Sequence, residues 1–244
     1  ETFPALQIKP VICVSPDPEI REAALERIET GKEESWILLF SNLQESIESF
    51  HRVTPSLILL DLEEVEMPNI FNITFPRGTW VLLLSEEVSR WHKKADAEGR
   101  ACLLIIHRGI LSIPQYLEMG LRLAYAKEGS GVQRSIQILH GVIEYIENHY
   151  GKGILRWQLA DSVNVSEDYL SRVFRKLVGI TPWEYLLRYR IRKAQGFLRS
   201  RDRTIREIAD ACGFHDQAYF CRVFRNITGT SPRAYQKNTL TLNV

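Results

Sequence analysis

The second half of the chain contains one pattern twice, at an offset of 50 residues. The matching positions, in order, are Tyr169 and Tyr219, Arg172 and Arg222, Val173 and Val223, Phe174 and Phe224, Arg175 and Arg225, Gly179 and Gly229, Thr181 and Ser231, Pro182 and Pro232, and Tyr185 and Tyr235. Just upstream the offset is 49, because Ala160-Asp161 matches Ala209-Asp210 and Val165 matches Phe214. So many matches in order indicate a duplicated unit, with one extra residue in the turn of the second copy.

Each copy predicts a short helix, a tight turn and a longer helix. Ala160 and Ala209 are small residues on the short helices, and they allow a second helix to cross closely. Gly213 tolerates a left-handed backbone in the turn, and Ser166 and Asp216 are typical N-caps for the longer helices. Two helices joined by such a turn form the helix-turn-helix pattern. We therefore expect two such units, joined by a helix at about 182–199.

The longer helix of each copy is amphipathic. Apolar residues form the inward stripes: Leu170, Val173, Phe174 and Leu177, then Phe220, Val223 and Phe224. The opposite faces carry Asp168, Ser171, Arg172 and Arg175, then Gln217, Ala218, Cys221, Arg222 and Arg225. Arg can bind guanine O6 and N7, and Gln can bind adenine N6 and N7, each with two hydrogen bonds. These faces predict base reading in a DNA major groove; the alternative is that the arginines only solvate the helices.

The joining helix carries a further set of cations: Arg188, Arg190, Arg192, Lys193 and Arg199. From the sequence, these either contact DNA phosphates or are solvated.

The formal net charge of +1 conceals two halves of opposite sign. Residues 1–128 hold 13 basic and 20 acidic side chains, a net charge of −7, and residues 129–244 hold 18 and 10, a net charge of +8. Such asymmetry predicts a division of labour in which the basic half is the candidate for binding nucleic acid.

The acidic half alternates short apolar runs with amphipathic segments. The runs are residues 11–15, 36–40, 57–62, 80–85 and 101–107, and helices are expected at about 17–30, 43–52, 86–98 and 112–127. Leu57-Ile58-Leu59-Leu60 is apolar on both strand faces, as a buried parallel strand requires. This alternation predicts an α/β fold with a five-stranded parallel sheet and helices on both faces.

The basic half of the chain resembles the DNA-binding domain of the AraC/XylS family of bacterial transcription regulators, most specifically in the second copy of the repeat. The residues that carry the resemblance are Ile208-Ala209, Cys212-Gly213-Phe214, Tyr219-Phe220, Arg222, Phe224-Arg225, Gly229, Ser231-Pro232 and Tyr235, within a match over about residues 135–238. The resemblance implies a sequence-specific regulator that binds double-stranded DNA through two recognition helices, at about Glu167–Leu177 and Asp216–Asn226. It also implies contact with RNA polymerase if the protein is an activator.

The resemblance assigns a DNA-binding set on both units. Base contacts are expected from Asp168, Ser171, Arg172, Gln217, Ala218, Cys221 and Arg222. The set also includes Ser166, and phosphate contacts are expected from Arg175, Thr181, Arg225 and Ser231. Two residues depart from the family pattern. The Asp168 carboxylate accepts from cytosine N4 or repels phosphate, and Gln236 stands where the family often has Arg.

The acidic half resembles a response-regulator receiver domain of flavodoxin-like fold. Residues 11–21 resemble its first strand and helix, and residues 55–61 resemble its third strand ending in a phosphoacceptor, Asp61. Ser85 falls at the switch hydroxyl position. Phosphoryl transfer needs Mg²⁺ held by carboxylates, but Ser15-Pro16 replaces the acidic pair and His107-Arg108 replaces the usual lysine. A pseudo-receiver is therefore expected, and phosphorylation of Asp61 is the alternative. A flavodoxin-like ligand sensor or enzyme and a non-specific DNA binder are further alternatives.

The remaining expectations concern organisation and partners. The predicted divisions are a receiver-like domain at 1–128, a linker at 129–134, the DNA-binding domain at 135–238 and a tail at 239–244. Four cysteines without metal spacing are expected to be free thiols in a reducing cytoplasm. No catalytic triad, phosphate loop, cofactor, metal site or membrane span is expected. A homodimer is expected, through either the receiver-like face or a heptad-like seam of Val132, Ile136, Leu139, Ile143, Ile146 and Tyr150, whose other interpretation is a core helix.

Overall fold

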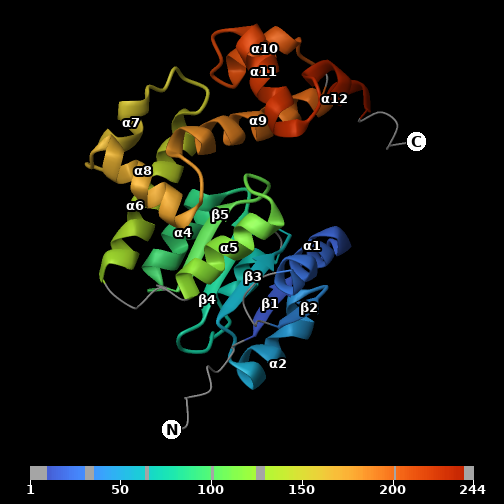
Figure 1. Cartoon of the computed structure of the whole chain (residues 1–244), viewed down its shortest axis with the longest axis vertical. Helices are drawn as coiled ribbons and strands as arrows, with labels where there is room; N and C mark the ends of the chain where they lie inside the picture. Colours follow the sequence, from blue (N-terminus) through green and yellow to red (C-terminus); the bar gives the residue numbers. More distant parts are fainter. Residues whose placement is uncertain are drawn as a thin grey trace. The chain divides into compact units, whose positions relative to one another are not determined.

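The structure is a computed structural model, and it describes residues 10–30, 36–63, 66–99, 102–124, 130–200 and 202–238. The chain forms two compact units (Figure 1). The first comprises residues 1–140 with 177–179, and the second comprises residues 141–176 and 180–244. The predicted tail and residue 129 of the predicted linker lie outside the described residues.

The first unit contains a five-stranded parallel sheet in the order β2-β1-β3-β4-β5. The strands are β1 (Val11–Val14), β2 (Ile37–Phe40), β3 (Leu57–Asp61), β4 (Trp80–Ser85) and β5 (Leu103–His107). Every residue of β3 is buried, as its continuous apolar run predicts. This strand order is that of the flavodoxin-like doubly wound fold, so the predicted α/β class is confirmed.

The helices of the first unit follow the strands. They are α1 (Pro18–Glu29), α2 (Leu43–Val53), α3 (Met67–Ile70), α4 (Val88–Ala97) and α5 (Ile113–Ala124). Asp17 and Asn42 begin α1 and α2 by accepting from Glu19 N at 2.9 Å and Glu45 N at 3.0 Å. Helices α1 and α5 contact each other, and α5 also lies against β3 and β4. Asp61 is the last residue of β3, so it lies at the carboxyl edge of the sheet, where the strands lead into the loops before the helices.

Helices alone make up the described part of the second unit, with α6 beginning in the first unit. They are α6 (Ser130–His149), α7 (Arg156–Asp161), α8 (Glu167–Leu177), α9 (Pro182–Ser200), α10 (Ile205–Ala211), α11 (Gln217–Thr228) and α12 (Pro232–Asn238). Residues 130–134 of the predicted linker lie within α6. Ile136, Leu139, Ile143 and Ile146 of the heptad-like seam are each at most 3% exposed. These four residues are therefore core residues rather than a free coiled-coil surface.

The sequence repeat is also a repeat of packing. Phe174 and Tyr185 meet edge to face with ring centroids 5.9 Å apart, and Phe224 and Tyr235 meet in the same way at 5.6 Å. Phe174 and Phe224 are fully buried. In each helix-turn-helix unit the same aromatic pair thus packs the longer helix against the helix that follows it, α8 against α9 and α11 against α12. Such a pair stabilises the fold by about 1 kcal/mol beyond simple burial.

The four cysteines are free thiols, with Cys13 and Cys212 buried and Cys102 and Cys221 partly buried. Burial raises the pKa of both the Cys13 and the Cys212 thiol to about 12. Across the described residues, no helix is long and apolar enough to cross a membrane.

Candidate nucleic-acid interface

The two helix-turn-helix turns have the same backbone geometry. Asn164 and Gly213 both adopt a left-handed conformation, with φ of 54° and 76°. In the first turn Val165 N donates to Ala160 O at 3.1 Å, and in the second Phe214 N donates to Ala209 O at 2.9 Å. These bonds end α7 and α10 in the manner of a Schellman motif. The 49-residue offset upstream of the turns therefore reflects equivalent structure.

The two predicted recognition helices, α8 and α11, begin at the predicted caps. Ser166 Oγ accepts from Tyr169 N at 3.2 Å, and Asp216 Oδ1 accepts from Ala218 N at 2.7 Å. Ser166 and Asp216 lie 50 residues apart, so α8 and α11 start at equivalent positions despite the extra residue in the second turn. Their exposed faces are consequently in the same register.

The exposed faces of α8 and α11 carry the predicted base-contact residues. Leu170, Val173, Phe220 and Val223 are buried beneath them. Ser171 and Cys221 are partly buried. The other predicted residues of these faces are exposed: Asp168, Arg172, Arg175, Gln217, Ala218, Arg222 and Arg225. The structure thus places the predicted base-contact residues of each helix-turn-helix unit on one face of α8 or of α11.

An arginine lies over a tyrosine ring on both recognition helices. The guanidinium carbon of Arg172 is 5.7 Å from the Tyr169 ring centroid, and that of Arg222 is 5.9 Å from the Tyr219 ring centroid. Within the described part of the chain neither guanidinium forms an ion pair. The ring restrains each arginine without neutralising it, so its donors remain available to an acceptor in solution.

Two of the predicted phosphate-contact residues are helix caps. Thr181 Oγ1 accepts from Glu184 N at 3.1 Å at the start of α9, and Ser231 Oγ accepts from Ala234 N at 3.2 Å at the start of α12. Each hydroxyl accepts in this bond and keeps its proton to donate.

Sequence reasoning missed two residues beside Thr181. Arg156 lies over the Trp183 ring at 5.3 Å, and both line a pocket of about 170 Å³ with Ser171, Arg175 and Thr181. Arg156 and Trp183 come from different helices, so no spacing in the sequence could join them. Arg156 therefore adds a second cation beside Arg175 at the first helix-turn-helix pattern, in a pocket that Glu167 also lines.

The cations of α9 fall into different environments. Arg188 pairs with Glu184 at 2.7 Å, and exposed Arg199 donates to the Tyr235 hydroxyl at 3.2 Å. Arg190 is only 3% exposed. The expectation that α9 cations are either solvated or bound to phosphate is therefore wrong for Arg190, which is a residue of the core.

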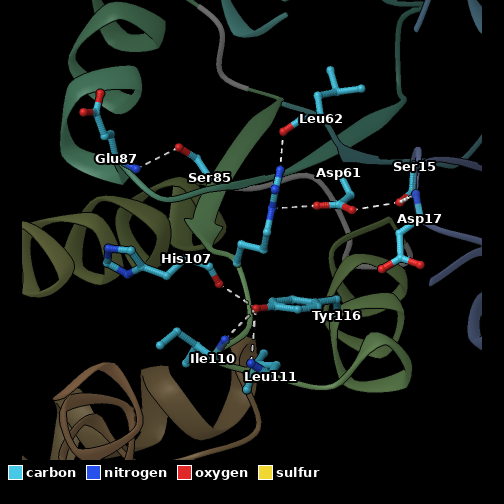
Figure 2. Close-up of polar contacts among 11 residues, drawn as sticks. Ser15, Asp17, Asp61, Leu62, Ser85, Glu87, His107, Ile110, Leu111 and Tyr116 are labelled. Atoms are coloured by element: carbon cyan, nitrogen blue, oxygen red, sulfur yellow. Dashed lines mark hydrogen bonds and ion pairs between the residues drawn. The ribbon is translucent and has the colours of Figure 1, made fainter. Parts of the chain in front are cut away.

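The candidate phosphoacceptor, Asp61, is a buried carboxylate whose two oxygens are both engaged. Asp61 is 3% exposed; Ser15 Oγ donates to Oδ2 at 2.8 Å and Arg108 Nε is 2.8 Å from Oδ1. Arg108 also donates to Leu62 O. Ser15 and Arg108 directly follow β1 and β5, and Asp61 is the last residue of β3. Figure 2 shows the Asp17 carboxylate turned away from Asp61. The Arg108 guanidinium therefore occupies the space beside Asp61 Oδ1.

Neighbouring groups hold this arrangement in place. The Tyr116 hydroxyl donates to His107 O at 2.5 Å and accepts from Ile110 N and Leu111 N, at 3.0 and 3.1 Å (Figure 2). It thereby fixes the loop that carries Arg108. Ser85 Oγ accepts from Glu87 N at 2.9 Å. Among the described residues there is no group of three or more His, Cys, Asp or Glu side chains that could hold a metal ion.

Comparison with known proteins matches the second unit. Residues 159–238 match the family described as "Helix-turn-helix domain". The chain is 37% identical over 112 residues to the uncharacterized HTH-type transcriptional regulator YijO of Escherichia coli, a match that covers 45% of this chain and 40% of YijO. It is 36% identical over 95 residues to the HTH-type transcriptional activator RhaS of Escherichia fergusonii, covering 39% of this chain and 34% of RhaS.

Solved structures match the same region. The C-terminal domain of AraT, a response regulator from Geobacillus stearothermophilus, is 33% identical with a TM-score of 0.40, over 41% of this chain and 84% of that domain. The chain spans about two fifths of the length of the curated relatives it matches first. The matches to these regulators coincide with the two equivalent turns, caps and basic helix faces, and residues 159–238 are therefore a helix-turn-helix domain of the AraC/XylS family.

Proposed function

We propose that the protein is a sequence-specific transcription regulator that reads double-stranded DNA with α8 and α11. The observation that carries the proposal is the pair of equivalent exposed faces, each with an unpaired arginine over a tyrosine ring. Recognition helices of this kind enter major-groove segments that lie about one helical turn, roughly 34 Å, apart on one face of the duplex. The proposed DNA-binding domain comprises about residues 135–238.

Within this proposal the exposed residues divide by chemistry. Arg172, Arg222 and Gln217 read base edges, because they can form two hydrogen bonds in one plane. Ser171, Ala218 and Cys221 present small surfaces to bases, and Asp168 accepts from cytosine N4. Arg175, Arg225, Thr181 and Ser231, with Ser166 at the first cap, hold phosphates and fix the register.

We propose that about residues 1–128 form a regulatory or dimerising pseudo-receiver domain. Its strand order and the position of Asp61 at the end of β3 favour this interpretation. The alternative of control through Asp61 phosphorylation is less well supported, since Arg108 and Ser15 already engage both carboxylate oxygens. We propose a cytoplasmic homodimer that regulates rather than catalyses, with RNA polymerase contact if it activates.

Selection of bound duplexes from a random library tests the proposal, followed by gel shifts with the selected site. Wild-type protein should recover a defined motif in two segments about one turn apart. Arg222→Ala should cost about 1–3 kcal/mol at one base position while binding to random DNA changes little. The result against the assignment is equal weakening of cognate and random DNA by Arg222→Ala. The absence of any preferred motif at moderate salt would indicate a non-specific binder.

A further inference from the structure

Arg190 is a cation buried in the second unit without an acidic partner. It is 3% exposed on α9, and within the described part of the chain no carboxylate pairs with it. Burial lowers its pKa from the ordinary value, but an arginine guanidinium stays charged in proteins. A buried charge is costly unless hydrogen bonds satisfy it, so its contacts must serve a purpose in the fold.

The guanidinium binds backbone that lies 38 to 40 residues earlier in the chain. Arg190 Nε donates to Tyr150 O at 2.9 Å, and Arg190 Nη2 donates to Lys152 O at 2.7 Å. These two carbonyls lie just after α6, in the segment that leads into α7 of the first helix-turn-helix unit. The planar fork of arginine can hold both carbonyls at once, which a flexible ammonium matches less well.

The same guanidinium lies against the turn of the second helix-turn-helix unit. Its central carbon is 5.5 Å from the Phe214 ring centroid. A Cβ atom added at Gly213 would lie 2.7 Å from Arg190 Nη2 and 2.4 Å from Tyr150 O. The glycine is therefore required both for its φ of 76° and for the close approach of the turn to this cation.

The described residues show no equivalent contact at the turn of the first helix-turn-helix unit, between α7 and α8. Its left-handed turn residue is Asn164, an exposed residue with a side chain, at the position that corresponds to Gly213. Only the second turn combines a missing side chain with a buried cation, among the turns described for the two units. Arg190 thus joins three segments: the end of α6, the bridging helix α9, and the turn that leads into α11.

We propose that Arg190 is a positioning residue that sets the orientation of the second helix-turn-helix unit on α6 and α9, and so fixes where α11 presents Gln217 and Arg222 to DNA. This inference rests on the proposed function. A bidentate base contact discriminates against a wrong base pair by roughly 5- to 150-fold, and it depends on a fixed direction of approach. Loss of the brace should therefore reduce discrimination by α11 while leaving that of α8 intact.

The experiment uses the full chain and the motif selected with wild-type protein. Arg172→Ala and Arg222→Ala first identify the base pairs read by α8 and by α11. The affinities of Arg190→Met and Arg190→Lys are then measured on duplexes with single base-pair replacements. The temperature is kept well below the midpoint of thermal unfolding of each variant. Arg206→Met is the matched control, because Arg206 is an exposed arginine on α10.

Arg190→Met should lower discrimination at the α11 base pairs by about tenfold or more and leave discrimination at the α8 base pairs unchanged. Arg190→Lys should restore part of the loss, and Arg206→Met should alter neither set of discrimination ratios. A folded Arg190→Met with wild-type discrimination at the α11 pairs, or with equal loss at both sets, overturns the positioning role. If Arg190→Met does not fold, wild-type discrimination by Arg190→Lys overturns it.

If neither variant folds, Arg190 is a core residue only, and the inference is rejected. A wild-type protein without any base preference instead refutes the proposed function before Arg190 is changed. The two failures are thereby distinguished.

Discussion

Removing the Arg108 side chain should destabilise the first unit more than any exposed arginine does. Arg108→Met keeps most of the aliphatic stem and deletes the guanidinium that lies 2.8 Å from Asp61 Oδ1. Asp61 is 3% exposed, so the variant leaves a buried carboxylate without this ion pair, while Ser15 Oγ still donates to Oδ2. A buried carboxylate that loses its partner is expected to cost about 3–5 kcal/mol.

The expected magnitude lies at the lower end of that range. The Arg108 side chain is 31% exposed, so water can reach part of the space it leaves and solvate the carboxylate. We therefore expect a loss of about 3 kcal/mol for Arg108→Met. Adding Asp61→Asn removes the negative charge that Arg108 balanced and keeps an acceptor for Ser15, so the double variant should recover about 1–2 kcal/mol.

Hydrogen exchange of the β1, β3 and β4 amides measures this loss in the full chain. Exchange reports the opening of the sheet itself, whereas a single denaturation curve mixes two units that need not unfold together. Arg77→Met is the matched control, since Arg77 is exposed in the same unit, and it should change stability by less than about 0.5 kcal/mol. The reasoning is refuted if Arg108→Met matches Arg77→Met, or if the double variant is no more stable than Arg108→Met.

Three further predictions concern charge. Arg175→Gln should weaken binding to selected and random DNA alike and reduce the slope of log K against log salt by about 0.9 if one phosphate contact is lost, measured by titration between 50 and 200 mM salt. Burial and the neighbouring His92 lower the pKa of His140 to about 3; the neutral ring favours the folded state, so stability should fall with pH from about 6.5 toward 3, by up to about 1.4 kcal/mol per pH unit. His140→Gln should flatten that decline in acid unfolding curves. Incubation with a small phosphodonor and Mg²⁺ should add no mass to the intact protein, and a gain of one phosphate abolished by Asp61→Asn would contradict the pseudo-receiver.

The sheet could be predicted because its strands are unusually explicit. Runs such as Leu57–Leu60 are apolar on both faces, which suits only a strand covered on both sides. Helix α3 was missed because it is a single turn, Met67–Ile70, containing Pro68, and so has no amphipathic period to detect. Residues 130–134, which the sequence placed in a linker, are helical in the structure. Gly131 lies inside α6, and one exposed glycine costs a helix only about 1 kcal/mol.

The interface could be predicted where one helix carries all of its parts. Ser166, Arg172 and Arg222 follow from capping and helical spacing, which are local rules. Arg156 and Trp183 could not be found in this way, because their contact depends on how α7 and α9 meet. The same limit applies to Arg108 and Asp61, which lie at the ends of β5 and β3, two strands that β4 separates in the sheet.

The arginines of α9 show that residue type alone does not determine the role of a charged side chain. Arg188, Arg190 and Arg192 alternate along one helix, and their residue type alone predicts the same role for each. The tertiary fold assigns them by cost: Arg188 stays at the surface with Glu184, whereas Arg190 is buried because two backbone carbonyls and the Phe214 ring replace its water. A buried cation that satisfies carbonyls from another segment fixes geometry rather than attracting DNA. The net charge of +8 in this half therefore overstates the positive surface available to phosphates, and the proposed DNA contacts rest on the exposed arginines of α8 and α11.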